Sequence, residues 1–65
     1  GRPLPALDKD LMTMLESFEG VTAHVDVLIA RSGLPAHRAL QVLLELELGG
    51  FVARHPGMFY SRRLP

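Results

Sequence analysis

The stretch Gly33–Val52, which reads GLPAHRALQVLLELELGGFV, decides the fold of this chain. Pro35 stands at its start, where the fixed φ of proline suits the first turn of a helix and the missing N–H is not needed. Gly49-Gly50 ends it, and glycine is favoured just after a helix because it adopts left-handed φ without penalty. Between these signals lies a run of helix formers with five leucines. The stretch therefore predicts a helix over 35–48.

This predicted helix has two unequal sides when its residues are placed at about 100° intervals. The broad apolar side holds Ala36, Ala39, Leu40, Leu43, Leu44 and Leu46. The polar side holds His37, Arg38, Gln41 and Glu45. Val42 and Leu48 lie at opposite borders between the two sides. Glu47 projects into the apolar side, and because a lone buried carboxylate is costly, we expect it to accept hydrogen bonds at the edge of the core as a structural residue.

The segments before this stretch predict two shorter helices. Asp8 is a suitable N-cap, and an apolar stripe with helical spacing follows it, so we expect a helix over 8–18. Residues 21–23 are expected to form a brief extended segment. A second helix is predicted over 25–32, and Gly33 is expected to be its left-handed C-cap.

The segments after it predict a β-hairpin. Residues 51–55 and 58–61 have strand character, and Pro56-Gly57 between them is a strong turn signal. We expect the domain to cover 7–62, with a linker or expression remnant at 1–6 and a tail at 63–65. The chain begins GRPLP and not with Met, so we expect it to be a domain excised from a larger protein.

Composition limits the chain to one small domain. It has 65 residues, 48% of them hydrophobic, no cysteine and a net charge of zero. The charge is uneven, because residues 1–34 carry −2 and residues 35–65 carry +2. No apolar run approaches the roughly 20 residues that a membrane span needs, so we expect a cytoplasmic protein that makes no membrane contact.

The order of predicted elements defines the fold class. A helix, a short extended segment, two helices joined by a tight glycine turn, and a C-terminal hairpin make a small α+β fold that is mainly helical. This is the plan of the winged helix-turn-helix, in which the hairpin is the wing.

The chain also resembles the C-terminal winged-helix domain of the DprA/Smf family of DNA-processing proteins. Three pieces carry the resemblance: Asp26-x-Leu28-x-Ala30-x-x-Gly33-Leu34, the block LLELEL at 43–48 followed by GGFV, and the short Pro56-Gly57 wing with Tyr60 after it. The resemblance covers about Leu7 to Arg62, and the leucine–glutamate block is its most family-specific part.

The resemblance implies a parent protein of natural transformation. Such a parent binds incoming single-stranded DNA through a separate Rossmann-like domain and helps to load RecA onto it. The winged helix at its end is an accessory module with proposed roles in DNA contact or in protein association. No residue of this chain is therefore assigned the parent's main activity.

Two kinds of interaction site are predicted from the residues. In a winged helix the free face of the third helix enters the major groove and the wing touches the DNA backbone. The candidates for nucleic-acid contact are His37, Arg38, Gln41, Arg54, His55, Arg62 and Arg63. With so few cations, we expect weak binding that is steeply sensitive to salt. The alternative is a transcription regulator that reads DNA with this helix and the wing.

Protein association is the second kind, and we expect it to be slightly favoured over DNA contact. The candidates are Met12 and Val27, which lie off the apolar stripes of their helices, Val42, which borders the polar side of the third helix, and Met58, which is expected to be exposed in the hairpin. The expected partners are other domains of the parent or another copy of it, with RecA reached through the parent.

Catalysis is not expected. His24, His37 and His55 lack metal-ligand spacing, and no nucleophile motif or phosphate-binding glycine loop is present. We therefore predict no enzyme activity, no catalytic or metal-binding residue, no cofactor and no small-molecule substrate.

Overall fold

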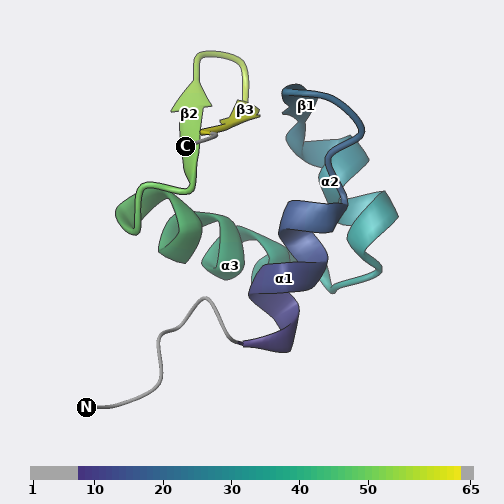
Figure 1. Cartoon of the computed structure of the whole chain (residues 1–65). Helices are drawn as coiled ribbons and strands as arrows, with labels where there is room; N and C mark the ends of the chain where they lie inside the picture. The colour runs from purple at the N-terminus through teal and green to yellow at the C-terminus, as the bar shows by residue number, and fades with distance from the viewer. Residues whose placement is uncertain (1–7, 64–65) are drawn as a thin grey trace, which may run out of the picture.

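The fold is a three-helix core that carries a small antiparallel sheet (Figure 1). The structure is a computed structural model and describes residues 8–63. Within them the elements are α1 (Lys9–Glu16), β1 (Thr22–His24), α2 (Val25–Ser32), α3 (Ala36–Leu48), β2 (Val52–His55) and β3 (Phe59–Arg62). The predicted fold class, a small and mainly helical α+β winged helix, is confirmed.

Helix α1 has the predicted N-cap, begins one residue after the predicted start and ends early. The carboxylate of Asp8 accepts a hydrogen bond from the Asp10 N–H at 2.7 Å, which makes Asp8 the N-cap. The helix ends at Glu16 because Ser17 closes a tighter last turn: its N–H donates to the Met14 carbonyl at 3.0 Å and its hydroxyl to the Thr13 carbonyl at 2.8 Å. The predicted end at Phe18 is therefore wrong by two residues.

Helices α2 and α3 form the helix-turn-helix through a three-residue connection. Helix α2 has the predicted bounds, and Gly33 at φ 74° ends it, with its N–H donating to the Ile29 carbonyl at 3.2 Å. Pro35 is the N-cap of α3, so this helix begins one residue later than predicted. The N-cap of α2 is His24, which the sequence did not predict; its Nδ1 accepts a hydrogen bond from the Asp26 N–H at 3.0 Å.

The sheet has the order β1-β3-β2, so the last strand of the chain lies in the middle. The predicted hairpin is confirmed as β2 and β3, and Tyr60 of β3 pairs with Arg54 on one side and with Ala23 on the other. The expected extended segment at 21–23 is β1, shifted by one residue. Because His24 both ends β1 and caps α2, the sheet connects to the helix-turn-helix without a linker.

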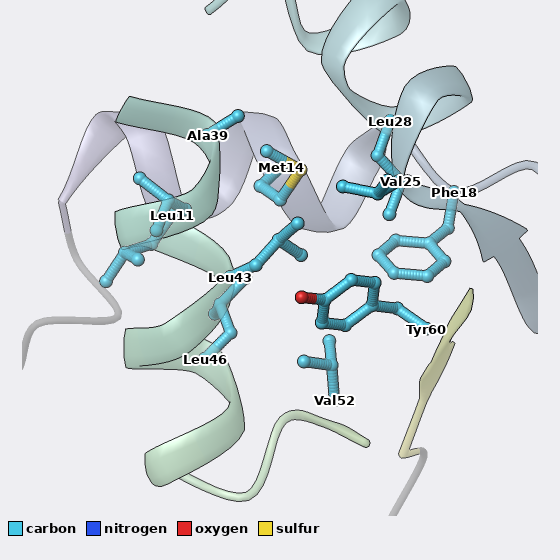
Figure 2. Packing of buried hydrophobic residues seen from close by; sticks show 11 residues of the cluster. Leu11, Met14, Phe18, Val25, Leu28, Ala39, Leu43, Leu46, Val52 and Tyr60 are labelled. Atoms are coloured by element: carbon cyan, nitrogen blue, oxygen red, sulfur yellow. The ribbon is translucent and has the colours of Figure 1, made fainter. Parts of the chain in front are cut away.

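The hydrophobic core contains one side of α3, surrounded by α1, α2 and the sheet (Figure 2). Its buried residues are Leu11, Met14, Phe18, Val25, Leu28, Ala39, Val42, Leu43, Leu46, Val52 and Tyr60. The four that belong to α3 follow the spacing i, i+3, i+4, i+7, which is the stripe expected for a helix with one covered face.

The apolar side of α3 is narrower than predicted and lies at a different angle. Val42, placed at a border and offered as an interface residue, is fully buried. Ala36, Leu40 and Leu44, placed on the core side, are exposed. The prediction was wrong because it merged two apolar rows of the helix into one broad face, whereas the neighbouring elements cover only the row that contains Val42 and Leu43.

Candidate interaction site on the third helix

A row of leucines occupies the surface of α3. Leu40, Leu44 and Leu48 follow one another at four-residue intervals, and their exposed fractions are 42%, 53% and 79%. At about 100° per residue, the point on the surface of α3 directly opposite the middle of its buried row lies between Leu44 and Leu48. We call these three residues the leucine row. It occupies the face that a winged helix would present to the major groove.

The polar side chains beside the leucine row carry little positive charge. His37, Gln41 and Glu45 are exposed next to it, as the sequence predicted for the free face. Glu47 is half-buried at the edge of the core, and its Oε1 lies 4.0 Å from Nε of Arg54. The expected position of Glu47 is confirmed, but among residues 8–63 its contact is an ion pair with Arg54 of the wing and not the expected hydrogen bond.

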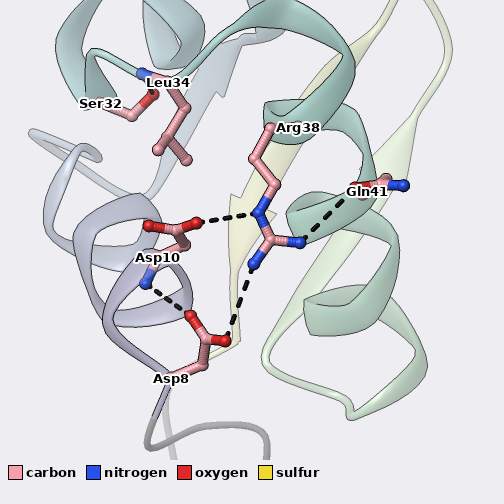
Figure 3. A network of polar contacts seen from close by, with 6 residues as sticks. All are labelled: Asp8, Asp10, Ser32, Leu34, Arg38 and Gln41. Atoms are coloured by element: carbon pink, nitrogen blue, oxygen red, sulfur yellow. Dashed lines mark hydrogen bonds and ion pairs between the residues drawn. The ribbon is translucent and has the colours of Figure 1, made fainter.

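Arg38, the sole arginine of α3, is held by α1 (Figure 3). Its Nε donates to Oδ2 of Asp10 at 2.8 Å, its Nη2 lies 3.7 Å from Oδ2 of Asp8, and its Nη1 donates to Gln41 at 3.5 Å. The hydrogen bond to Asp10, together with the charges of Asp10, Asp8 and Glu45, raises the pKa of Arg38. Arg38 therefore links two helices, and its charge is already matched by two carboxylates.

The cations predicted for the wing are only partly available. Arg54 is exposed and lies beside Glu47, while Nε2 of His55 is 2.7 Å from the Ser61 hydroxyl. Arg62 is half-buried within β3. Arg63 is exposed just after β3, and no carboxylate among residues 8–63 lies within 4.0 Å of it. The structure thus places the predicted nucleic-acid residues on α3, on both strands of the hairpin and just after it, and Arg38, Arg54 and His55 among them are already paired with other side chains.

The four predicted interface residues do not form one surface. Met12 on α1, Val27 on α2 and Met58 in the wing turn are each exposed, but Val42 lies inside the core. Sequence reasoning missed the leucine row as a surface. Its signal was present in the spacing i, i+4, i+8 of the leucines, which separates them from the i, i+3, i+4, i+7 row that is buried.

The described residues hold no group of three or more metal-binding side chains. Within the same range, 8–63, no helix has the length and apolar character needed to cross a membrane. A hollow in the surface is lined by Thr13, Glu16, Ser17 and Arg31.

The helix-turn-helix with a three-stranded sheet places the chain in the winged-helix class. The family model of the DprA winged helix domain matches residues 1–58, so the chain belongs to that family, as the sequence resemblance indicated. No curated protein and no solved structure matches the chain.

Proposed function

We propose that this chain is an accessory winged-helix module of a DprA-like protein and that it serves protein association through the leucine row. The parent would act in natural transformation in the cytoplasm, where it handles single-stranded DNA and loads RecA. The module itself would catalyse no reaction and use no cofactor.

One observation carries this proposal: three exposed leucines lie on the face of α3 that would enter DNA, and the arginine of that helix is engaged by α1. A base-reading face needs side chains that hydrogen-bond to base edges, such as arginine, asparagine or glutamine. Here Leu40, Leu44 and Leu48 are exposed, while Arg38 is engaged by Asp8 and Asp10. Exposed apolar residues that gather on one face are typical of a protein-binding surface.

DNA contact is the second candidate, and the wing favours it. Arg54, Arg62 and Arg63 lie on or just after the hairpin, at the end of the fold that touches the DNA backbone in winged helices. Three cations would neutralise at most a few phosphates, so the binding would be weak and would fall steeply with salt.

The association role is tested with cysteine variants, because the chain has no natural cysteine. In the full-length parent, the thiol of Leu44→Cys should be alkylated more slowly than in the 65-residue chain, since a partner surface covers it there. Met12→Cys is the matched control, because Met12 is similarly exposed on α1 and should react at the same rate in both. Equal rates at position 44 would contradict the proposal.

The DNA role is tested by fluorescence anisotropy with single-stranded and duplex oligonucleotides at low salt. Arg63→Ser should weaken whatever binding occurs, because it removes an exposed cation. Leu44→Ser leaves the net charge unchanged and should have no effect. If Leu44→Ser lowers DNA affinity as much as Arg63→Ser does, then the free face of α3 contacts DNA and the association role is wrong.

A further inference from the structure

The sheet has a second face, opposite the hydrophobic core, that is open to solvent. Ala23, Val52 and Tyr60, one residue from each strand, pack against the core. Successive side chains of a strand point to opposite faces of a sheet, so the strand residues next to these three lie on the other side. We name that side the outer face, and its strand residues are Thr22, His24, Ala53, His55, Phe59 and Ser61.

Phe59 lies at the centre of the outer face. It belongs to the middle strand, and the register places it between His24 of β1 and His55 of β2. The centroids of the Phe59 and His24 rings are 5.0 Å apart and the rings are nearly perpendicular, at 82°. The Phe59 ring also lies against Gly57, where a Cβ would be 3.5 Å from its Cδ2. The ring is thus held by its neighbours, yet 43% of Phe59 is exposed, which makes it a preorganised surface for a second flat ring.

The charge of the sheet favours an anionic ligand. None of the three strands contains Asp or Glu. Arg63 extends the outer face beyond β3: its N–H donates to the Phe51 carbonyl at 2.9 Å, so the pairing with the β2 side continues, and alternation places Arg63 on the same side as Ser61. Arg63 is exposed, and none of the carboxylates of residues 8–63 lies within 4.0 Å of it.

The acidic group beside the outer face lies at its opposite edge. Oδ2 of Asp26, in the first turn of α2, is 3.7 Å from Nδ1 of His24. An anionic ligand is therefore favoured along β3 from Phe59 toward Arg63, and disfavoured at the β1 edge. The distance along this path is about 13 Å, since it covers four residues at about 3.3 Å each.

We infer that the outer face of the sheet binds a short segment of single-stranded nucleic acid, with a base stacked on Phe59 and the phosphate backbone beside Arg63. An unpaired strand combines negative charge with flat rings that are free to stack, and proteins bind it by pairing cations with exposed aromatic side chains. In a duplex the bases are already stacked and paired, so they do not reach Phe59. The site is separate from the leucine row and from the free face of α3, and it shares only Arg63 with the backbone contact proposed for the wing.

Tryptophan fluorescence tests the stacking directly, because the chain has no natural tryptophan. In the Phe59→Trp variant, a short oligothymidylate at low salt should quench the fluorescence, since a base stacks on the indole. A duplex of similar length should quench it much less. Met12→Trp is the matched control, because 45% of Met12 and 43% of Phe59 are exposed, and its fluorescence should not change with either oligonucleotide.

Fluorescence anisotropy with a labelled oligothymidylate measures what the aromatic ring contributes to affinity. Phe59→Leu should weaken binding by about tenfold, the effect of losing one stacked base. Phe59→Tyr keeps an aromatic ring at the same position and should bind like the wild type. Circular dichroism verifies that both variants remain folded.

Three outcomes would overturn the inference. They are unchanged fluorescence of the Phe59→Trp variant at saturating oligothymidylate, equal quenching by the duplex, and equal affinities of the wild type and Phe59→Leu. If Arg63→Ser weakens binding while Phe59→Leu does not, the wing contacts only the phosphate backbone and the stacking site is wrong. The association role is unaffected by these outcomes, because it is judged by the alkylation of Leu44→Cys.

Discussion

Leu43→Ala and Leu44→Ala are the same chemical change at neighbouring positions of α3, one on its buried side and one on its exposed side. Comparing the stability of the two variants therefore tests which side of the helix is buried. Leu43 has no exposed surface, whereas 53% of Leu44 is exposed. Truncating a fully buried leucine costs about 2–5 kcal/mol, which includes the cavity that is left. At Leu44 about half of the side chain is already in water, so its truncation should cost at most about 1 kcal/mol, partly offset by the higher helix propensity of alanine.

These magnitudes are large relative to the stability of the domain. A chain of this length has a total unfolding free energy of about 3–10 kcal/mol at the usual value per residue. Leu43→Ala should therefore remove a substantial fraction of it and lower the Tm by about 10 °C or more, since 1 kcal/mol corresponds to about 4–8 °C in a small domain. Leu44→Ala should change the Tm by less than about 8 °C on the same scale.

Thermal unfolding followed by circular dichroism measures both variants, at a protein concentration low enough to keep the chain monomeric. If Leu44→Ala lowers the Tm as much as Leu43→Ala does, then both leucines are buried in the monomer. The leucine row would then not be a surface, and the association role would lose its basis.

Three further predictions concern the local structure. Gly33→Ala should destabilise the domain by about 1 kcal/mol in urea unfolding, because Gly33 has a left-handed φ. Gly20→Ala is the control and should have little effect, because a Cβ at Gly20 also has free space around it but the φ of Gly20 is not positive. Equal effects of the two substitutions would contradict the C-cap role of Gly33. Burial raises the pKa of Tyr60, while the charge of Arg54 lowers it and that of Glu47 raises it by a smaller amount. Because Tyr60 is the sole tyrosine, ultraviolet titration should give a tyrosinate pKa above the ordinary value of about 10. The free energy of unfolding should be constant below that ordinary value and fall as pH rises through the folded pKa, and Tyr60→Phe should remove this loss. A double-mutant cycle of Arg38→Gln and Asp10→Asn should give a favourable coupling free energy, and additive effects would contradict the link between α1 and α3.

Local signals in the sequence were enough to predict most of the elements. Helix α2 was predicted with correct bounds because Gly33 marks its end, and the hairpin was predicted because Pro56-Gly57 marks its turn. The end of α1 was missed, since the Ser17 hydroxyl can bond to the Thr13 carbonyl in more than one type of turn and the sequence does not determine which forms. Such boundary errors change no conclusion about the fold.

The interaction surface was harder to predict because it depends on how the helices pack. Periodicity identifies apolar rows on α3, but it does not say which row the neighbouring elements cover. Val42 and Leu44 were therefore assigned to the wrong sides. Arg38 was predicted to be free for the same reason, since its pairing with Asp10 joins residues 28 positions apart and requires α1 to lie against α3.

The central position of β3 has a consequence for the synthesis of this domain. A ribosome produces α1, β1, α2, α3 and β2 before Phe59, yet β1 and β2 each pair with β3 and not with one another. Tyr60, which closes the core from the sheet side, is also made near the end. The growing chain therefore cannot pair β1 or β2, or cover the core from the sheet side, until β3 has left the ribosome.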